Sequence, residues 1–249
     1  MSAPLAPSDA SAPAAAAPRP ASTVVLLRER DGGGAPEILM VRRTRGASFM
    51  ADAYVFPGGR VEPEDGEGEP GFARAGAREL REEAGITVDA DALVPLAHWI
   101  TPSAEPKRFD ARFFIGAMPH GQVAKHDAVE TVDALWCSAA ELLERYQRGE
   151  LKLPPPTIRN LEELAPHATV EAAIAWARAR PIAAILPKLV SVANATEGIG
   201  DTLAIVLPWD PEYPSLPGEG APIAASHPVA RQPSRFVLEQ GRWWGRAAT

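Results

Sequence analysis

The segment from Phe56 to Ile86 constrains the fold more than any other part of this 249-residue chain. Pro57-Gly58-Gly59 must end any strand before it, because proline lacks an amide donor and glycine favours turns. Ala73–Ala84 is a run of strong helix formers, and Gly85 is a natural C-cap for that helix. Residues 64–71 (EDGEGEPG) have no helical period and are expected to be a loop. The segment therefore predicts a strand, a loop and a helix in close succession.

Apolar runs and turn signals predict further elements on both sides of this segment. The predicted strands are Thr23–Leu27, Ile38–Val41, Leu93–Ile100, Arg112–Ala117 and Glu130–Trp136. The predicted helices are Ser138–Arg148, which opens with a capping-box spacing, and then Ile158–Leu164 and Val170–Arg178. After Pro181 the signals weaken, although Leu203–Leu207 suggests a strand. Strands and helices that do not strictly alternate predict an α+β fold of the α/β/α sandwich type.

Three regions are expected. Residues 1–21 are an Ala/Pro-rich, disordered tail, residues 22–150 are a folded domain, and residues 151–249 are a partly helical C-terminal extension packed on it. Trp243 and Trp244 are candidates for docking the end of this extension onto the domain. The extension is also expected to cover the site or to make a homodimer contact.

Composition narrows the function. A formal net charge of -7 argues against bulk electrostatic binding to nucleic acid or to acidic membranes. No apolar run approaches the roughly 18–20 residues of a membrane-spanning helix. The single cysteine, Cys137, excludes an intramolecular disulfide, and the N-terminus lacks the features of a targeting signal. We therefore expect a cytoplasmic protein that binds neither nucleic acid nor membranes.

The predicted helix after the Gly-Gly turn carries Glu79, Glu82 and Glu83, which share one face at i, i+3 and i+4. Three like charges there cost stability unless a cation lies among them. Hard divalent cations such as Mg²⁺ take oxygen ligands and keep positions for water and phosphate. Arg78 can hold a carboxylate in a bidentate pair, and a carbonyl of the Gly-Gly turn can add a ligand. The alternative is an ordinary solvated helix face.

These residues also carry a resemblance. Arg78–Ile86 matches R-E-U-x-E-E-x-G-U, the second half of the Nudix box, at every fixed position, and Phe56–Gly59 matches the turn that commonly opens it. On these motifs the chain is identified as a member of the Nudix hydrolase superfamily, with a resemblance that covers Ser22 to about Arg148. Membership implies the Nudix fold, a mixed sheet between helices, and hydrolysis of a phosphoanhydride bond with Mg²⁺ or Mn²⁺.

The resemblance also implies roles for individual residues. Glu79, Glu82 and Glu83, with the Gly58 carbonyl, resemble the metal ligands of the family, and Arg78 resembles its orienting arginine. A water then attacks phosphorus in line with the leaving phosphate, and Glu79 or a loop carboxylate accepts its proton. A further ligand often comes from a loop before the last core strand. Glu130 is the candidate there, with a solvated charge as the alternative.

Phosphate recognition is expected from arginines outside the box. Arg43 and Arg45 have the fork geometry that pairs with phosphate, and Arg112 can add positive field at an otherwise acidic mouth. For each, a simple surface charge is the alternative. Trp99 and Phe113 pack in the core or stack on a base.

The box departs from the usual G-x5-E-x7-R-E pattern. Asp65 precedes Arg78 by thirteen positions, so the loop is about five residues longer than the pattern. Asp65, Glu67 and Glu69 compete for the place of its first glutamate. A lengthened box resembles a coenzyme A diphosphatase branch, as does the segment from Ala47 to Gly59.

The branch motif is matched only in part. Aligned on Phe56, Arg43 and Thr44 stand at the right spacing, whereas Ser48 and Asp52 replace an expected arginine and glycine. The expected activity is hydrolysis of a nucleoside-diphosphate-linked compound, with coenzyme A or acyl-coenzyme A as the leading substrate. A nucleotide sugar, a dinucleotide or a nucleoside triphosphate is the alternative substrate, and a non-catalytic ligand-sensing module is the alternative function.

Overall fold

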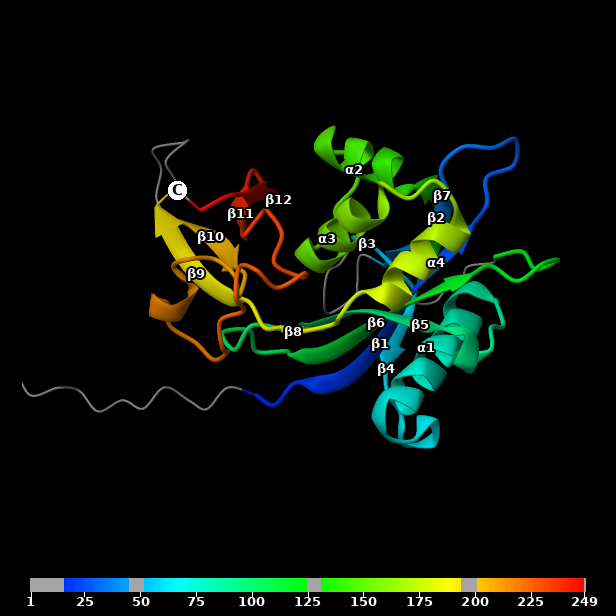
Figure 1. Cartoon of the computed structure of the whole chain (residues 1–249), viewed down its shortest axis with the longest axis horizontal. Coiled ribbons are helices and arrows are strands. Elements are labelled where there is room, and N and C mark those ends of the chain that lie inside the picture. Colours follow the sequence, from blue (N-terminus) through cyan, green and yellow to red (C-terminus); the bar gives the residue numbers. More distant parts are fainter. Residues whose placement is uncertain (1–15, 45–51, 125–130, 194–200, 249) are drawn as a thin grey trace, which may run out of the picture.

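A mixed sheet of eight strands lies at the centre of the molecule (Figure 1). The structure, a computed structural model, describes residues 16–44, 52–124, 131–193 and 201–248. The sheet contains β1 (Arg19–Arg28), β2 (Glu37–Arg43), β3 (Tyr54–Val55), β4 (Gly58–Arg60), β5 (Val94–Ile100), β6 (Phe109–Ala117), β7 (Thr131–Ser138) and β8 (Ala184–Ile185). The strand order is β3-β2-β1-β6-β5-β8, with β4 paired to β1 and β7 paired to β2.

Strand β1 is the hub of this sheet. It runs parallel to β6, from Arg19↔Phe109 to Leu27↔Ala117, and antiparallel to β2 and β4. The strand begins at Arg19, earlier than the predicted start at Thr23 and within the tail predicted for residues 1–21. The reason is long-range pairing, because Ala21 lies opposite both Arg60 in β4 and Ala111 in β6.

Helices cover both faces of the sheet. Side chains alternate along β1, so Val24 and Leu26 pack on one face with α1 (Gly68–Ala84), and Val25 and Leu27 pack on the other. The second face is covered by α2 (Ala139–Gln147), α3 (Pro155–Leu164) and α4 (Val170–Ala179), as Figure 1 shows. The α/β/α sandwich predicted from the sequence is therefore confirmed. Within the described ranges, every helix is too short or too polar to cross a membrane.

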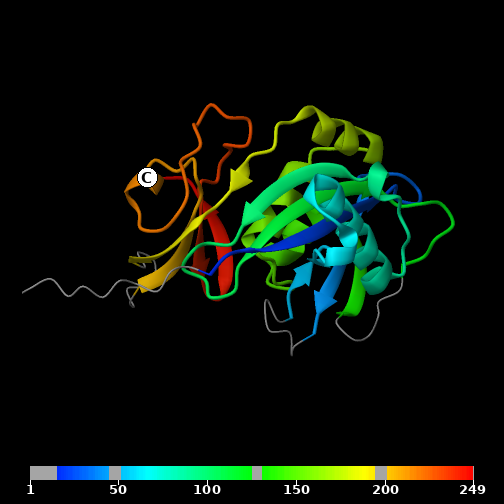
Figure 2. The same cartoon turned by 90° about the horizontal axis from the view of Figure 1, so that it is seen from below.

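A smaller sheet follows in the C-terminal extension. Its strands form an antiparallel meander of β9 (Lys188–Ala193), β10 (Asp201–Val206), β11 (Arg235–Glu239) and β12 (Arg242–Arg246). Figures 1 and 2 both show it at the end of the main sheet that lies away from α1. Phe236 of β11 and Trp209 belong to the same core cluster as α2 and α3. The hydroxyl of Tyr146 in α2 donates to the carbonyl of Trp243 at 2.6 Å.

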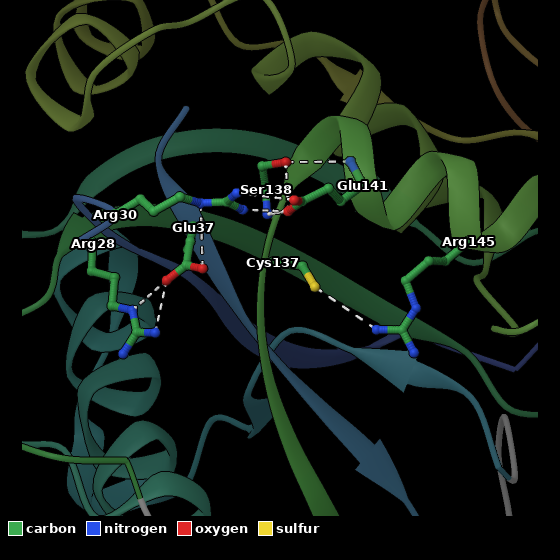
Figure 3. A network of polar contacts seen from close by, with 7 residues as sticks. All are labelled: Arg28, Arg30, Glu37, Cys137, Ser138, Glu141 and Arg145. Carbon is green, nitrogen blue, oxygen red and sulfur yellow. Dashed lines mark hydrogen bonds and ion pairs between the residues drawn. The ribbon is translucent and has the colours of Figure 1, made fainter. Parts of the chain in front are cut away.

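A polar network ties the β1–β2 hairpin to the start of α2 (Figure 3). The guanidinium of Arg30 donates to both oxygens of Glu141, with 2.9 Å from Nη1 to Oε1. The same carboxylate accepts from the backbone N–H of Ser138 at 2.9 Å, which confirms the predicted capping box. These hydrogen bonds, first of all the one from Arg30, lower the pKa of Glu141 to about 2. Glu141 therefore stays ionised at neutral pH and fixes the position of α2 on the sheet edge.

Candidate active site

Helix α1 starts earlier than the sequence indicated. Residues 64–71 were expected to be a loop, but Gly68–Gly71 form the first turn of the helix. Pro70 is tolerated there because the first turn needs no amide donors. Gly71 permits a close approach, since a Cβ at this position would lie 2.3 Å from the carbonyl oxygen of Gly66. The helix ends as predicted, with Gly85 in the left-handed conformation at φ 67° and its N–H donating to Arg81 O at 3.0 Å.

The centre of α1 rests directly on β1 through Gly76. A Cβ at Gly76 would lie 2.8 Å from both Ser22 Oγ and Val24 Cγ2. Ser22 and Val24 are completely buried. The missing side chain therefore lets the helix lie close enough to the sheet for its carboxylates to reach β4.

Two glutamates of α1 lie against the Gly-Gly strand. The carboxylate of Glu83 accepts from the N–H of Gly58 at 3.0 Å and is only 5% exposed. A Cβ on Gly59 would lie 2.3 Å from Glu79 Oε1, so the carboxylate of Glu79 occupies the space that any larger residue would fill. The absence of a side chain at Gly59 thus makes room for the carboxylate of Glu79 against the β4 backbone.

Arg78 holds the acidic groups of the site together. Its Nη1 donates to Glu79 Oε1 at 2.9 Å and to Glu82 Oε2 at 3.0 Å. Its Nη2 donates to the carbonyl of Arg60 at 2.8 Å and to Asp65 Oδ2 at 3.0 Å, and its Nε donates to Asp65 Oδ1 at 3.2 Å. These acceptors, above all Asp65, raise the pKa of Arg78 above its ordinary value. The arginine is therefore a permanent cation that fixes two glutamates and the β4 strand.

Of the three loop carboxylates that competed for the first glutamate's place, the structure pairs Asp65 with Arg78. Burial disfavours the charged form of Asp65, but hydrogen bonds from Arg78 and from the Glu62 amide outweigh it, and the pKa of Asp65 is lowered. Glu69 instead lies 3.3 Å from Arg112. The sequence could not make this choice, because it depends on how the lengthened loop folds.

The residues around Arg78 offer a divalent cation only oxygen ligands. No group of three or more His, Cys, Asp or Glu side chains within the described ranges forms a ready-made metal cage. Arg78 and the Gly58 amide donate hydrogen bonds to oxygens of the three helix glutamates. Carboxylate oxygens keep further lone pairs when they accept one hydrogen bond, and Mg²⁺ needs only one or two carboxylates beside water and phosphate oxygens. The groups present are therefore all oxygen donors, the ligands that a hard cation prefers.

The remaining predicted site residues are distributed as follows. Arg43 ends β2 on the α1 face, since side chains alternate from Leu39, which packs with α1. Its Nε is buried and has no hydrogen-bond partner among the described residues. Arg112 is brought to the start of α1, over the ring of Phe72 at 5.2 Å, and not to the glycines of β4. Glu130 and Arg45 lie outside the described residues.

The two aromatic candidates for base stacking are core residues. Trp99 is 4% exposed and Phe113 is 7% exposed, and both belong to the cluster on the sheet face opposite α1. One contact of the site was missed by sequence reasoning. Arg74 reaches back from α1 to the lengthened loop, and its position four residues before Arg78, on the same helix face, was the available signal.

The sandwich, with a helix that presses glutamates and an arginine onto a Gly-Gly strand, defines a Nudix-fold domain. The model of the NUDIX domain family matches residues 17–157, which is more than half of the chain. The chain therefore belongs to the Nudix family of hydrolases, in which dependence on a divalent metal ion is general.

Individual relatives are distant. The chain is 27% identical to a crystal structure of a NUDIX hydrolase from Alicyclobacillus acidocaldarius, with a TM-score of 0.57, covering 64% of this chain and 96% of that one. It is 26% identical over 163 residues to the putative nudix hydrolase 7 of Caenorhabditis elegans, covering 51% of this chain and 55% of that protein. It is 27% identical over 143 residues to the acyl-coenzyme A diphosphatase NUDT19 of Xenopus laevis, covering 55% of this chain and 37% of that protein. The chain thus spans about half or less of the length of these two relatives.

Proposed function

We propose that this protein hydrolyses the phosphoanhydride bond of a nucleoside-diphosphate-linked compound, with coenzyme A or an acyl-coenzyme A as the leading substrate. The observation that carries the proposal is the constellation around Arg78, which holds Glu79 and Glu82 while Glu79 and Glu83 lie against Gly58-Gly59. Its components match the positions at which the family's metal ligands are expected. The likeness to the Xenopus diphosphatase and the lengthened box support the choice of substrate.

The chemistry would divide among these residues. Glu79, Glu82 and Glu83, with the Gly58 carbonyl and Glu130, would hold Mg²⁺ or Mn²⁺. When bound, such a cation neutralises charge on a diphosphate and activates a water for attack. Glu79, or a carboxylate of the lengthened loop, would accept the proton of the attacking water.

The arginines would act on the substrate and on the carboxylates. Arg78 remains protonated and keeps Glu79 and Glu82 in one pose throughout. The Nε of Arg43 is buried without a hydrogen-bond partner among the described residues, and Arg43, with Arg45, would bind substrate phosphate. Arg112 stays a candidate for adding positive field, although Glu69 and Asp110 already face its guanidinium.

Further properties remain predictions that accompany this proposal. A small-molecule partner follows from the proposed hydrolysis, and a cytoplasmic location and the absence of nucleic-acid and membrane partners are expected from the sequence. A homodimer is the oligomeric state to test, by sedimentation of the full chain.

The substrate is tested by a phosphate-release screen of the purified protein with Mg²⁺ and with Mn²⁺. The panel holds coenzyme A, acetyl-coenzyme A, NADH, ADP-ribose, dinucleoside polyphosphates and nucleoside triphosphates. Preferred turnover of coenzyme A species, with 3′,5′-ADP and a phosphopantetheine as products, is expected. Preferred turnover of another compound keeps the hydrolase and replaces its substrate. Metal and nucleotide binding without any turnover would instead identify a ligand-sensing module.

The metal assignment is tested by Glu82→Gln. The Glu82 side chain is 51% exposed, so the amide should leave the stability nearly unchanged. Hydrolysis should fall by about 100-fold or more, because a hard ligand and its charge are lost. Glu171→Gln is the matched control, since Glu171 is exposed on α4 at the opposite face of the sheet. Wild-type turnover in Glu82→Gln would remove Glu82 from the metal site.

A further inference from the structure

The lengthened loop before α1 has a second tie to the helix, independent of Arg78. The Nε of Arg74 donates to the backbone carbonyl of Asp65 at 2.6 Å. A Cβ on Gly66 would lie 2.7 Å from Arg74 Nη2, so the guanidinium fills the space that glycine leaves open. Gly66 also has a φ of 79°, a backbone conformation that favours glycine. The loop thus fits around the Arg74 side chain.

The loop itself is a built structure. A short 3₁₀ turn, Pro63–Asp65, is closed by a reciprocal contact with Glu62. The N–H of Glu62 donates to Asp65 Oδ2 at 2.9 Å, and the N–H of Asp65 donates to Glu62 O at 3.0 Å. Arg74 therefore binds the backbone carbonyl of Asp65, and the carboxylate of Asp65 in turn binds Arg78.

We propose that Arg74 is a positioning residue for the active site, acting through Asp65 and Arg78 on Glu79 and Glu82. The inference rests on the proposed hydrolase function of these glutamates. In this chain the acidic partner of Arg78 stands on a loop about five residues longer than the usual box. Such a loop has more backbone freedom, and a carboxylate on it is held only if the loop is held. Arg74 supplies that constraint from the helix that also carries the glutamates.

A purely structural role of Arg74 makes a different prediction. The side chain is exposed, and hydrogen bonds of exposed arginines usually change stability little. If Arg74 only stabilised the first turns of α1, its removal would change the melting temperature and leave metal binding and turnover unchanged. The positioning role instead predicts weaker metal binding and slower turnover with a nearly unchanged melting temperature.

The first experiment measures Mn²⁺ affinity in the absence of substrate, by electron paramagnetic resonance, for the full chain and for Arg74→Ala. We expect the variant to bind Mn²⁺ about 3- to 10-fold more weakly, as for the loss of one hydrogen bond that fixes a charged group. Amide hydrogen exchange should become faster at Asp65 and Gly66. Arg81→Ala is the matched control, because Arg81 is an exposed arginine on the same helix. Its side chain makes no hydrogen bond or ion pair with the residues that the structure describes. Equal Mn²⁺ affinity in wild type and Arg74→Ala would overturn the proposal.

A double-mutant cycle tests the route. If Arg74 acts through Asp65, Arg74→Ala should change Mn²⁺ affinity and kcat in the wild-type background but by less than about 1.5-fold in an Asp65→Ala background. Additive effects of the two substitutions would contradict the relay. Arg74→Lys, which keeps a donor, should restore part of the loss. Mn²⁺ binding and hydrogen exchange can be measured without turnover. If the protein shows no hydrolytic activity, the proposed function is refuted, but these two measurements still test whether Arg74 positions the site through Asp65.

Discussion

Among single residues, the two glycines of the FPGG turn are required for different reasons. A Cβ on Gly58 would meet backbone, 2.3 Å from Ser22 O and 2.7 Å from Thr23 Cα. The three atoms nearest to a Cβ on Gly59 would all belong to the carboxylate of Glu79, the far end of a flexible side chain that can rotate away. Gly58 is therefore required by the fold, and Gly59 by the pose of a proposed catalytic group.

Gly59→Ala should accordingly separate activity from stability. The methyl group displaces the Glu79 carboxylate by an ångström or so, which we expect to lower kcat by about 100-fold. The free energy of unfolding should fall by less than about 1 kcal/mol. Kinetics and urea denaturation of the same preparation check both. Gly58→Ala should show the opposite balance, with a stability loss of about 1–3 kcal/mol from the backbone overlap. A stability loss in Gly59→Ala as large as in Gly58→Ala would refute this division.

The residues of the site could be predicted from sequence to different degrees. Helical spacing alone places Glu79, Glu82 and Glu83 on one face, because a regular helix needs no tertiary information. The pairing of Arg78 with Asp65 could not be derived, since Glu67 and Glu69 were equally acceptable in charge. What decides is the 3₁₀ turn and the contact of Arg74 with the Asp65 carbonyl.

At the scale of elements, α2 is held by its first turn. Glu141 caps the helix through Ser138 and pairs with Arg30 across the β1–β2 hairpin (Figure 3). Its pKa is about 2 in the folded protein, below the ordinary 4.5. A lowered pKa contributes stability that is complete above about pH 4.5 and is lost as the pH falls toward 2.

Glu141→Gln should therefore destabilise the protein in a pH-dependent way. At pH 7 we expect a loss of about 0.5–1 kcal/mol, the range for partly exposed ion pairs. At pH 3 the difference from wild type should be smaller, because the wild-type carboxylate has begun to lose its advantage. Urea unfolding at both pH values measures this, with Glu144→Gln, an exposed residue of the same helix, as control. A difference that grows on acidification would contradict the assignment.

The features that were predicted correctly are those set by residues close together in the sequence. The capping box at Ser138 and the αL cap at Gly85 are confirmed, because both are contacts within one helix end. The first turn of α1 was missed, since its glycines and Pro70 are poor helix formers that tertiary packing overrides. The C-terminal meander was only hinted at by Leu203–Leu207, because its register depends on pairings between distant segments such as β9 with β10.

In the molecule as a whole, the hydrophobic core extends beyond the part that matches the family. The match ends at residue 157, whereas the core includes residues as far along the chain as Phe236. The sheet face opposite α1 is covered by α3 and α4, which follow the domain in sequence. Buried groups cross the same seam. Arg108, which is 4% exposed, donates to Glu219 at 3.0 Å, and the hydroxyl of the buried Tyr146 donates to Trp243 O at 2.6 Å. We therefore propose that residues 151–249 fold as one unit with the domain.

Phe236→Ala tests this unity. Phe236 is fully buried in the C-terminal sheet and belongs to the cluster that includes Ile38 and Phe113 of the main sheet. Its truncation should cost about 3–5 kcal/mol, and in one cooperative unit that loss is shared by the active-site domain. Thermal unfolding followed by the fluorescence of Trp243 and Trp244 and by residual hydrolase activity should then shift together. If only the midpoint of the fluorescence transition shifted, the C-terminal sheet would unfold as an independent module. The stability of the active site would then not depend on it.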